Sequence, residues 1–185
     1  MTLSHHVLPP RVTINGHHAF ALRACTRRYN AAMDIKHADR PLVSLTVAGI
    51  ACRDDGYLVV EERVRGERML NQPAGHVEPG ESLIEAVIRE VREETSYAFE
   101  PTELLGLYHD NPASGRRILR VAIIGEAGEA PDDGPLDDGI IEARFMSREA
   151  IEASPLPHRS PFVTAAIHDF ERGQRFPLDL LHSIR

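Results

Sequence analysis

Residues 75–97 read Gly-His-Val-Glu-Pro-Gly-Glu-Ser-Leu-Ile-Glu-Ala-Val-Ile-Arg-Glu-Val-Arg-Glu-Glu-Thr-Ser-Tyr, and this stretch decides the fold. It predicts a helix that carries three carboxylates on one side, Glu90, Glu93 and Glu94, because they are spaced i, i+3 and i+4. A separate face is apolar and can be buried: Ile84, Val87, Ile88 and Val91. Since like charges stacked in this way destabilise an isolated helix, we expect a hard divalent cation with oxygen ligands to offset them.

The segment before the helix favours this interpretation over a merely solvated acidic face. Gly75 and Gly80 lie in a turn-like stretch, where a glycine lets the backbone approach a ligand and present its carbonyl. Glu81 stands at the helix entrance, and Arg89 lies four residues before Glu93. An arginine that forks to such a carboxylate would hold the loop on the helix. We therefore expect loop and helix together to form half of a metal site.

The stretch resembles the Nudix box, Gly-x5-Glu-x7-Arg-Glu-(apolar)-x-Glu-Glu-x-Gly-(apolar). The matching positions are Gly75, Glu81, Arg89, Glu90, Val91, Glu93, Glu94 and Tyr97. Ser96 departs from the pattern, because the family carries glycine where the helix ends in a left-handed residue. Serine adopts that conformation at a cost of about 1 kcal/mol. Three flanking segments, 57–62, 70–76 and 160–178, resemble the NudJ-type phosphatases of this family.

This resemblance implies a Nudix fold, a mixed β-sheet sandwiched between helices, within the α/β (α+β) class. It implies hydrolysis of phosphoanhydride bonds in nucleoside di- and triphosphates and in hydroxymethylpyrimidine pyrophosphate, with Mg²⁺ as cofactor and Mn²⁺ able to substitute. Glu90 and Glu94 are then metal ligands, the Gly75 carbonyl helps, and Glu93 is a third ligand or bridges to the metal through water. Glu93 or Glu94 is the general base that activates water. Arg89 and Glu81 complete the catalytic set as a brace between loop and helix.

Substrate contacts are predicted from the cationic and amide side chains near the box. Arg63, Arg65, Arg68 and Arg120 are candidates for binding phosphates, and a surface position is the competing interpretation for each. Asn71 and Gln72 either contact the base or sugar or tie down a strand end. Leu70 replaces an aromatic residue of the NudJ-type pattern, so stacking on a base is expected to be weaker.

Two other functions share these features. One is clean-up of oxidised nucleotides or dinucleotide polyphosphates, which needs the same metal site and a different base pocket. The other is a non-catalytic Nudix-fold module that binds a ligand. The intact set of box carboxylates speaks against the second, because such modules usually lose them.

Charge and composition restrict the partners. Residues 41–185 hold fifteen basic and twenty-six acidic residues, a net charge of −11, which is unfavourable for binding nucleic acid. No apolar run approaches the roughly 20 residues that cross a bilayer. Two cysteines give no disulfide framework or zinc site, so a cytoplasmic location is expected. We expect a small phosphorylated substrate as partner, no nucleic acid, no membrane, and a monomer or homodimer.

Two regions are predicted along the chain. Residues 1–40 form an extension that is either disordered, a targeting segment, or upstream of a natural start at Met33, and residues 41–185 form the Nudix hydrolase domain. Strands are expected at 43–52, 57–62, 69–74, 104–109, 118–125 and 140–146, with a hairpin turn at 53–56. The box helix should begin with a capping box of Ser82 and Glu85. Further helices are expected to open at 147–150 and to span 161–172.

Overall fold

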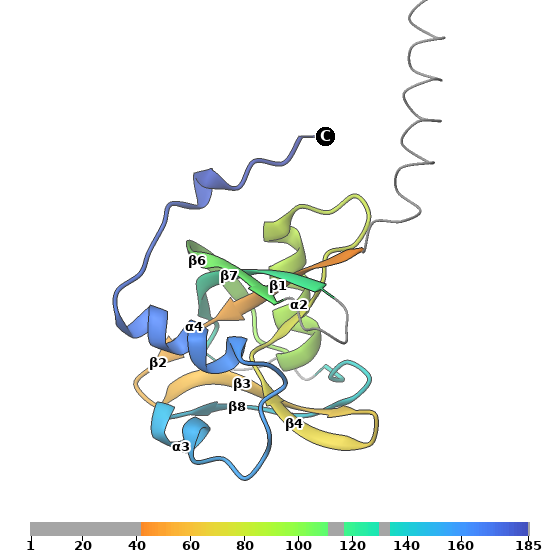
Figure 1. Ribbon diagram of the computed structural model, residues 1–185, viewed down its shortest axis with the longest axis vertical. Helices are drawn as coiled ribbons and strands as arrows, with labels where there is room; N and C mark the ends of the chain where they lie inside the picture. Colours follow the sequence, from red (N-terminus) through yellow and green to blue (C-terminus); the bar gives the residue numbers. More distant parts are fainter. Residues whose placement is uncertain (1–41, 111–116, 130–133, 185) are drawn as a thin grey trace, which may run out of the picture. The chain divides into compact units, whose positions relative to one another are not determined.

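The computed structural model describes residues 42–110, 117–129 and 134–184. Within that part of the chain, the strands and helices follow one another as Figure 1 shows. The strands are β1 (Val43–Ile50), β2 (Cys52–Arg53), β3 (Gly56–Val64), β4 (Glu67–Asn71), β5 (Ala74–His76), β6 (Phe99–Asp110), β7 (Arg117–Ala127) and β8 (Ile140–Met146). The helices are α2 (Leu83–Thr95), α3 (Arg148–Glu152), α4 (Phe162–Glu171) and a 3₁₀ turn, η1 (Leu178–Leu180). Each of these helices is too short or too polar to cross a membrane.

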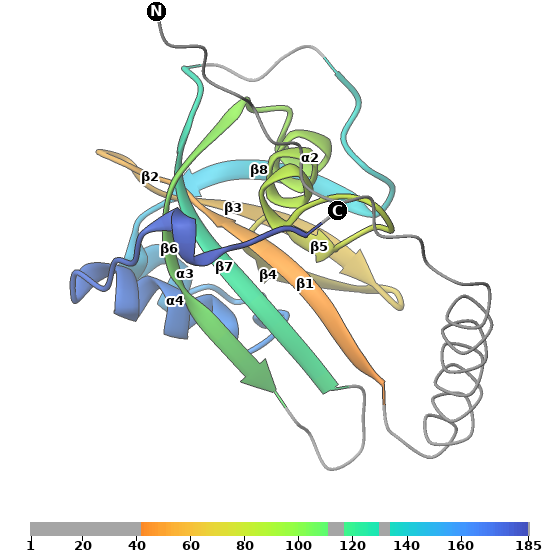
Figure 2. The same cartoon turned by 90° about the horizontal axis from the view of Figure 1, so that it is seen from above.

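The strands form two four-stranded sheets. The first has the order β5-β1-β7-β6, with β1 parallel to β7 and the other neighbours antiparallel. Figure 2 shows β1 lying between β5 and β7. The second contains β2, β3 and β4 in that order, and β8 pairs with β3 on its other side. Valine, isoleucine and threonine recur along β1 and β7, and these residue types pack well on a half-buried pleated surface.

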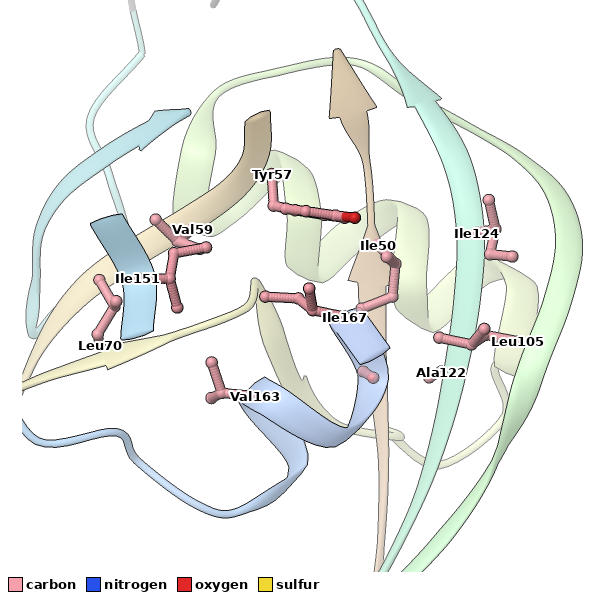
Figure 3. Close-up of a cluster of buried hydrophobic side chains, with 11 residues drawn as sticks. Ile50, Tyr57, Val59, Leu70, Leu105, Ala122, Ile124, Ile151, Val163 and Ile167 are labelled. Atoms are coloured by element: carbon pink, nitrogen blue, oxygen red, sulfur yellow. The ribbon is translucent and has the colours of Figure 1, made fainter. Parts of the chain in front are cut away.

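Two apolar clusters lie on opposite faces of the first sheet, because side chains alternate along a strand. Val47 belongs to the cluster that packs against α2, whereas Ile50 belongs to the cluster that packs against α4. The second sheet contributes to both clusters through the neighbours Leu58 and Val59. Figure 3 shows the α4 cluster, with Ile167 pointing into it. Full burial of an aliphatic side chain of this size stabilises a fold by roughly 1.5–3 kcal/mol.

This arrangement confirms the predicted fold class, a mixed sheet between helices. The hairpin at 53–56 is confirmed by the pairing of Cys52 with Tyr57 and of Arg53 with Gly56. The strand predicted at 140–146 is β8, with the same bounds. The short helix α3 begins directly after Ser147, whose hydroxyl accepts the Ala150 N–H at 3.2 Å.

The single strand predicted at 69–74 is wrong. β4 ends at Asn71, which pairs with Val60 in the second sheet, and β5 begins at Ala74, which pairs with Ala48 in the first. Pro73 lies between them and has no N–H to donate to a ladder, so the chain changes sheets there. In the same way, the strand predicted at 43–52 is divided between β1 and the short β2. The crossing from β4 to β5 brings the ends of both sheets to one site.

The predicted extension at 1–40 lies outside the described residues and stays a prediction. The sequence also predicts loops at the polar stretches 110–115 and 130–138, which contain proline or glycine, and both lie partly outside the described residues. Residues 134–138 of the second loop are described and form no helix or strand.

Candidate active site

The ends of α2 are set by its own sequence. The Ser82 hydroxyl accepts the Glu85 N–H at 3.1 Å, and a Glu85 carboxylate oxygen accepts the Ser82 N–H at 2.8 Å, which is the predicted capping box. Ser96 ends the helix in the left-handed conformation, with φ 58°. Its N–H donates to the Arg92 carbonyl at 2.8 Å, and its hydroxyl donates to the Gly134 carbonyl at 3.3 Å. Serine therefore fills the position where the family pattern has glycine.

Gly75 on β5 lies directly against the side chain of Glu90 on α2. A Cβ atom built at position 75 would lie 2.2 Å from each carboxylate oxygen of Glu90. Any other residue would push the strand away from the helix or displace the carboxylate. Glycine is therefore required here for close approach, and the backbone of β5 reaches the acidic face of α2.

Arg89 connects the loop to the helix through both ends of its guanidinium. Nε and Nη2 donate to the two carboxylate oxygens of Glu81 at 3.1 and 2.8 Å, and Nη2 also donates to the His76 carbonyl at 3.0 Å. Nη1 donates to Glu90 at 2.8 Å and to Glu93 at 2.9 Å. The hydrogen bonds from Arg89 hold the pKa of the Glu81 carboxyl below its usual range. This is the brace that the sequence predicts, with two carboxylates of the acidic face also engaged.

The three carboxylates of the acidic face differ in burial. Glu90 and Glu94 are each 8 % exposed, whereas the Glu93 side chain is 47 % exposed. A carboxylate oxygen of Glu94 accepts the Ala74 N–H at 2.7 Å. Burial raises the pKa of the Glu90 carboxyl, and it raises the pKa of the Glu94 carboxyl to about 8. For Glu94 this burial favours the protonated carboxyl, and a cation bound beside it would favour the ionised form.

A hard divalent cation fits the chemistry of this donor set, which consists of carboxylate and carbonyl oxygens. Among residues 42–110, 117–129 and 134–184, no three His, Cys, Asp or Glu side chains are already grouped so that they could hold a metal ion. Arg89 takes Glu90 and Glu93 as hydrogen-bond partners. Glu94 forms no ion pair with the described residues, and burial is the main cause of its raised pKa.

The acidic face opens into a cavity of about 810 Å³. Its walls come from β1, β3, β4, β5, β7, α2 and the segments before β8 and α4. The lining residues are Ser44, Thr46, Glu62, Arg65, Asn71, Ala74, Gly75, His76, Glu78, Arg89, Glu90, Glu93, Glu94, Ile118, Arg120, Asp137, Arg159 and Ser160. A volume of this size accommodates a small phosphorylated molecule.

Some of the predicted substrate contacts line the cavity, and others do not. Asn71, Arg120 and Arg65 line the cavity. Arg63 is exposed on β3 and does not line it, and Arg68 pairs with Glu61 outside it. Gln72 is 2 % exposed and donates to the Val163 carbonyl at 2.7 Å, so it anchors the start of α4 rather than facing the cavity.

Several residues that line the cavity are not predicted as site residues from the sequence. Glu62 accepts an Asn71 amide N–H at 2.9 Å and pairs with Arg159 at 3.5 Å across the cavity wall. The Asp137 N–H donates to the Glu93 carbonyl at 2.8 Å, which places the segment before β8 beside the end of α2. Ser44 and Thr46 are polar residues that alternate on the face of β1 that later carries Ala48 and Ile50, so this pattern is a signal in the sequence.

The sequence as a whole matches a known family model, described as NUDIX domain, over residues 43–166. The chain belongs to the Nudix family. Phosphatase NudJ from Escherichia coli strain K12 is 36 % identical over 138 residues, which cover 74 % of this chain and 89 % of that protein. A Nudix hydrolase from Nitrosomonas europaea is 45 % identical with a TM-score of 0.74, covering 78 % of this chain and 98 % of that one.

A MutT protein from Methanosarcina mazei shares the fold, with a TM-score of 0.57 at 24 % identity, covering 73 % of this chain and 96 % of that one. As a Nudix hydrolase, the protein is an enzyme that acts on pyrophosphate bonds. This confirms the predicted enzyme class over the non-catalytic module. The similarity to NudJ agrees with the subfamily to which the segments flanking the box pointed.

Proposed function

We propose that this Nudix hydrolase is a Mg²⁺-dependent pyrophosphohydrolase of nucleoside di- and triphosphates and of hydroxymethylpyrimidine pyrophosphate. The observation that carries the proposal is the pair of buried carboxylates, Glu90 and Glu94, packed against the Gly75 backbone at one end of the cavity. Such a pair suits a divalent cation. The similarity to Phosphatase NudJ supports pyrophosphate hydrolysis in general.

In this proposal Glu90, Glu94 and the Gly75 carbonyl hold the cation, and Glu93 completes the set directly or through water. When bound, the cation neutralises phosphate charge and lowers the pKa of a coordinated water. Mn²⁺ has similar ligand preferences and is expected to substitute. Arg89 keeps the acidic face aligned with the loop, because its guanidinium joins Glu81, Glu90 and the His76 carbonyl.

The proton of the attacking water goes to a box carboxylate. Glu93 is better placed than Glu94 for this role, since its side chain is 47 % exposed and can exchange the proton with solvent. The Glu94 carboxylate is buried and accepts a hydrogen bond from the Ala74 N–H. We therefore assign the general base to Glu93 and a holding role to Glu94.

The test is a phosphate-release screen with nucleoside di- and triphosphates, dinucleotide polyphosphates, nucleotide sugars and hydroxymethylpyrimidine pyrophosphate. We expect the highest kcat/KM for the nucleoside polyphosphates or the pyrimidine pyrophosphate, in the presence of Mg²⁺ or Mn²⁺. A clear preference for dinucleotide polyphosphates or oxidised nucleotides would instead favour the clean-up function. No release from any of them would refute the proposed activity.

A further inference from the structure

The face of the first sheet that packs against α4 is apolar at one end and polar at the other. Ile50 on β1 and Ile124 on β7 are paired in register and belong to the apolar cluster. Four residues earlier on each strand, and therefore on the same face, Thr46 is paired with Arg120. Both side chains line the cavity. The apolar core thus gives way to a polar floor next to the box carboxylates.

Arg120 on this floor is a buried cation with little compensation. It is 7 % exposed, and its contact to the Asn71 amide oxygen is long, at 3.5 Å. Its Nε has no hydrogen-bond partner within residues 42–110, 117–129 and 134–184. The Phe162 ring lies 5.2 Å from the guanidinium carbon and supplies a weak cation–π contact. Burial lowers the pKa of Arg120 to about 10, so the group is still charged at neutral pH.

Glu62, the acid with the largest Coulomb effect on the pKa of Arg120, forms its hydrogen bond and its ion pair with other residues. Glu62 accepts a hydrogen bond from Asn71 and pairs with Arg159 instead. Arg120 itself forms no salt bridge with the part of the chain that the structure describes. A buried charge without a salt bridge destabilises a fold, so its presence beside a substrate cavity points to a ligand of opposite charge.

Two further donors on the cavity wall also lack partners. The Thr46 and Ser160 hydroxyl oxygens are buried, and neither has a hydrogen-bond partner among the described residues. Thr46 is 5 % exposed, and Ser160 stands just before α4. Together with Arg120, they give one wall of the cavity a set of unused donors. The carboxylates of α2 line the same cavity.

We propose that Arg120, Thr46 and Ser160 form an anion subsite that binds a terminal phosphoryl group of the substrate. This inference rests on the proposed pyrophosphohydrolase function and specifies which substrates the cavity accepts. A terminal phosphoryl group has three free oxygens, whereas a phosphoryl group capped by a sugar has two and a ring carbonyl has one. Three unused donor side chains therefore fit the terminal group best, and the arginine fork matches phosphate geometry.

Arg120 is thus a specificity residue that favours substrates ending in a free pyrophosphate or triphosphate over nucleotide sugars. Arg120 and the box carboxylates line the same cavity, so one substrate can contact both the α2 end and the subsite.

The test uses the full-length protein stripped of metal, so that turnover plays no part. Thermal unfolding is followed while inorganic phosphate is titrated in, with ionic strength held constant by chloride, and a second titration uses uridine. The variants are Arg120→Met, which keeps the length and removes the charge, and Arg120→Lys, which keeps the charge and loses the fork. Arg172→Met is the matched control, because Arg172 is 63 % exposed at the end of α4 and does not line the cavity.

We expect phosphate to raise the Tm of the wild type and of Arg172→Met equally. Arg120→Met should weaken the apparent phosphate affinity by about tenfold or more, and Arg120→Lys by a smaller factor. If Arg120→Met does not fold, Arg120→Lys alone decides the question. The subsite is refuted by a wild type that does not respond to phosphate, by Arg120 variants that respond like the wild type, or by an Arg120-dependent response to uridine alone.

The proposed activity and the proposed subsite can be refuted independently of each other. Pyrophosphate hydrolysis without Arg120-dependent phosphate binding overturns the subsite and leaves the activity standing. Arg120-dependent phosphate binding without hydrolysis of any nucleotide overturns the activity and leaves an anion site.

Discussion

Gly75 and Glu90 approach so closely that a Cβ atom on residue 75 would lie 2.2 Å from both carboxylate oxygens of Glu90. We therefore predict that Gly75→Ala lowers kcat/KM by at least about tenfold, because the β5 backbone or the carboxylate must move. The strain should also lower the free energy of unfolding by about 1–3 kcal/mol. Kinetics and urea denaturation measure the two effects.

Gly128→Ala is the control for this change. A Cβ at position 128 would make an ordinary contact, 3.5 Å from the Ala98 Cβ, and Gly128 does not line the cavity. Both measurements should match the wild type. If the two alanine variants behaved alike, the close approach at Gly75 would have no bearing on the site.

Glu94 gives a prediction about stability and pH in the metal-free protein. Burial raises the pKa of this carboxyl from 4.5 to about 8. Between these pH values the folded protein binds more protons than the unfolded chain, so this group makes stability fall as pH rises. Glu94→Gln removes the effect and should be more stable than the wild type by at least about 1 kcal/mol at pH 8.

The difference should shrink as pH falls toward 5, where the wild-type carboxyl is protonated. Urea denaturation at several pH values, with metal removed, measures it. Glu100→Gln, an exposed position on β6, is the control and should show no such trend. A Glu94→Gln variant less stable than the wild type at pH 8 would contradict the interpretation of Glu94 as a buried carboxyl with a raised pKa.

The brace predicts strong coupling between Arg89 and Glu81. Two hydrogen bonds join them, at 2.8 and 3.1 Å, and their side chains are 24 % and 15 % exposed. A double-mutant cycle with Arg89→Ala and Glu81→Ala should give a coupling energy of about 1–3 kcal/mol in the free energy of unfolding.

A more exposed ion pair serves as the control for this coupling energy. Arg148 and Glu152 stand four residues apart on α3, with side chains 38 % and 50 % exposed. Their cycle should give less than about 0.5 kcal/mol. Additive effects at Arg89 and Glu81 would mean that the loop does not depend on the brace.

Much of this architecture follows from local sequence. The bounds of α2 were predicted from Ser82 and Glu85 at its start and from position 96 at its end, because capping is decided by hydrogen bonds within a few residues. The strand at 69–74 was predicted wrongly for the opposite reason. Its two halves pair with strands in different sheets, and strand partners are chosen by tertiary packing rather than by propensity.

The residues of the candidate site form the same two groups: some are predicted from local sequence, and others are brought together only by the fold. The acidic face and its brace lie within twenty residues of sequence, so spacing alone predicts that they meet. Arg120, Thr46 and Ser160 come from three separate segments, and their proximity depends on the parallel pairing of β1 with β7 and on the position of α4. Arg120 was one of four arginines named as candidates, and only the fold distinguishes it from Arg63 on an exposed strand surface.

The central claim is that the carboxylates of α2 bind a divalent cation that hydrolysis requires. The direct measurement is phosphate release from a nucleoside triphosphate, with and without Mg²⁺, by the wild type, Glu93→Gln, Glu94→Gln and the control Glu100→Gln. We predict that the wild type and the control need the metal, and that each of the two site variants loses at least about tenfold in turnover while remaining folded. Full activity in a chelator, or in the Glu93→Gln/Glu94→Gln double variant, would contradict the claim.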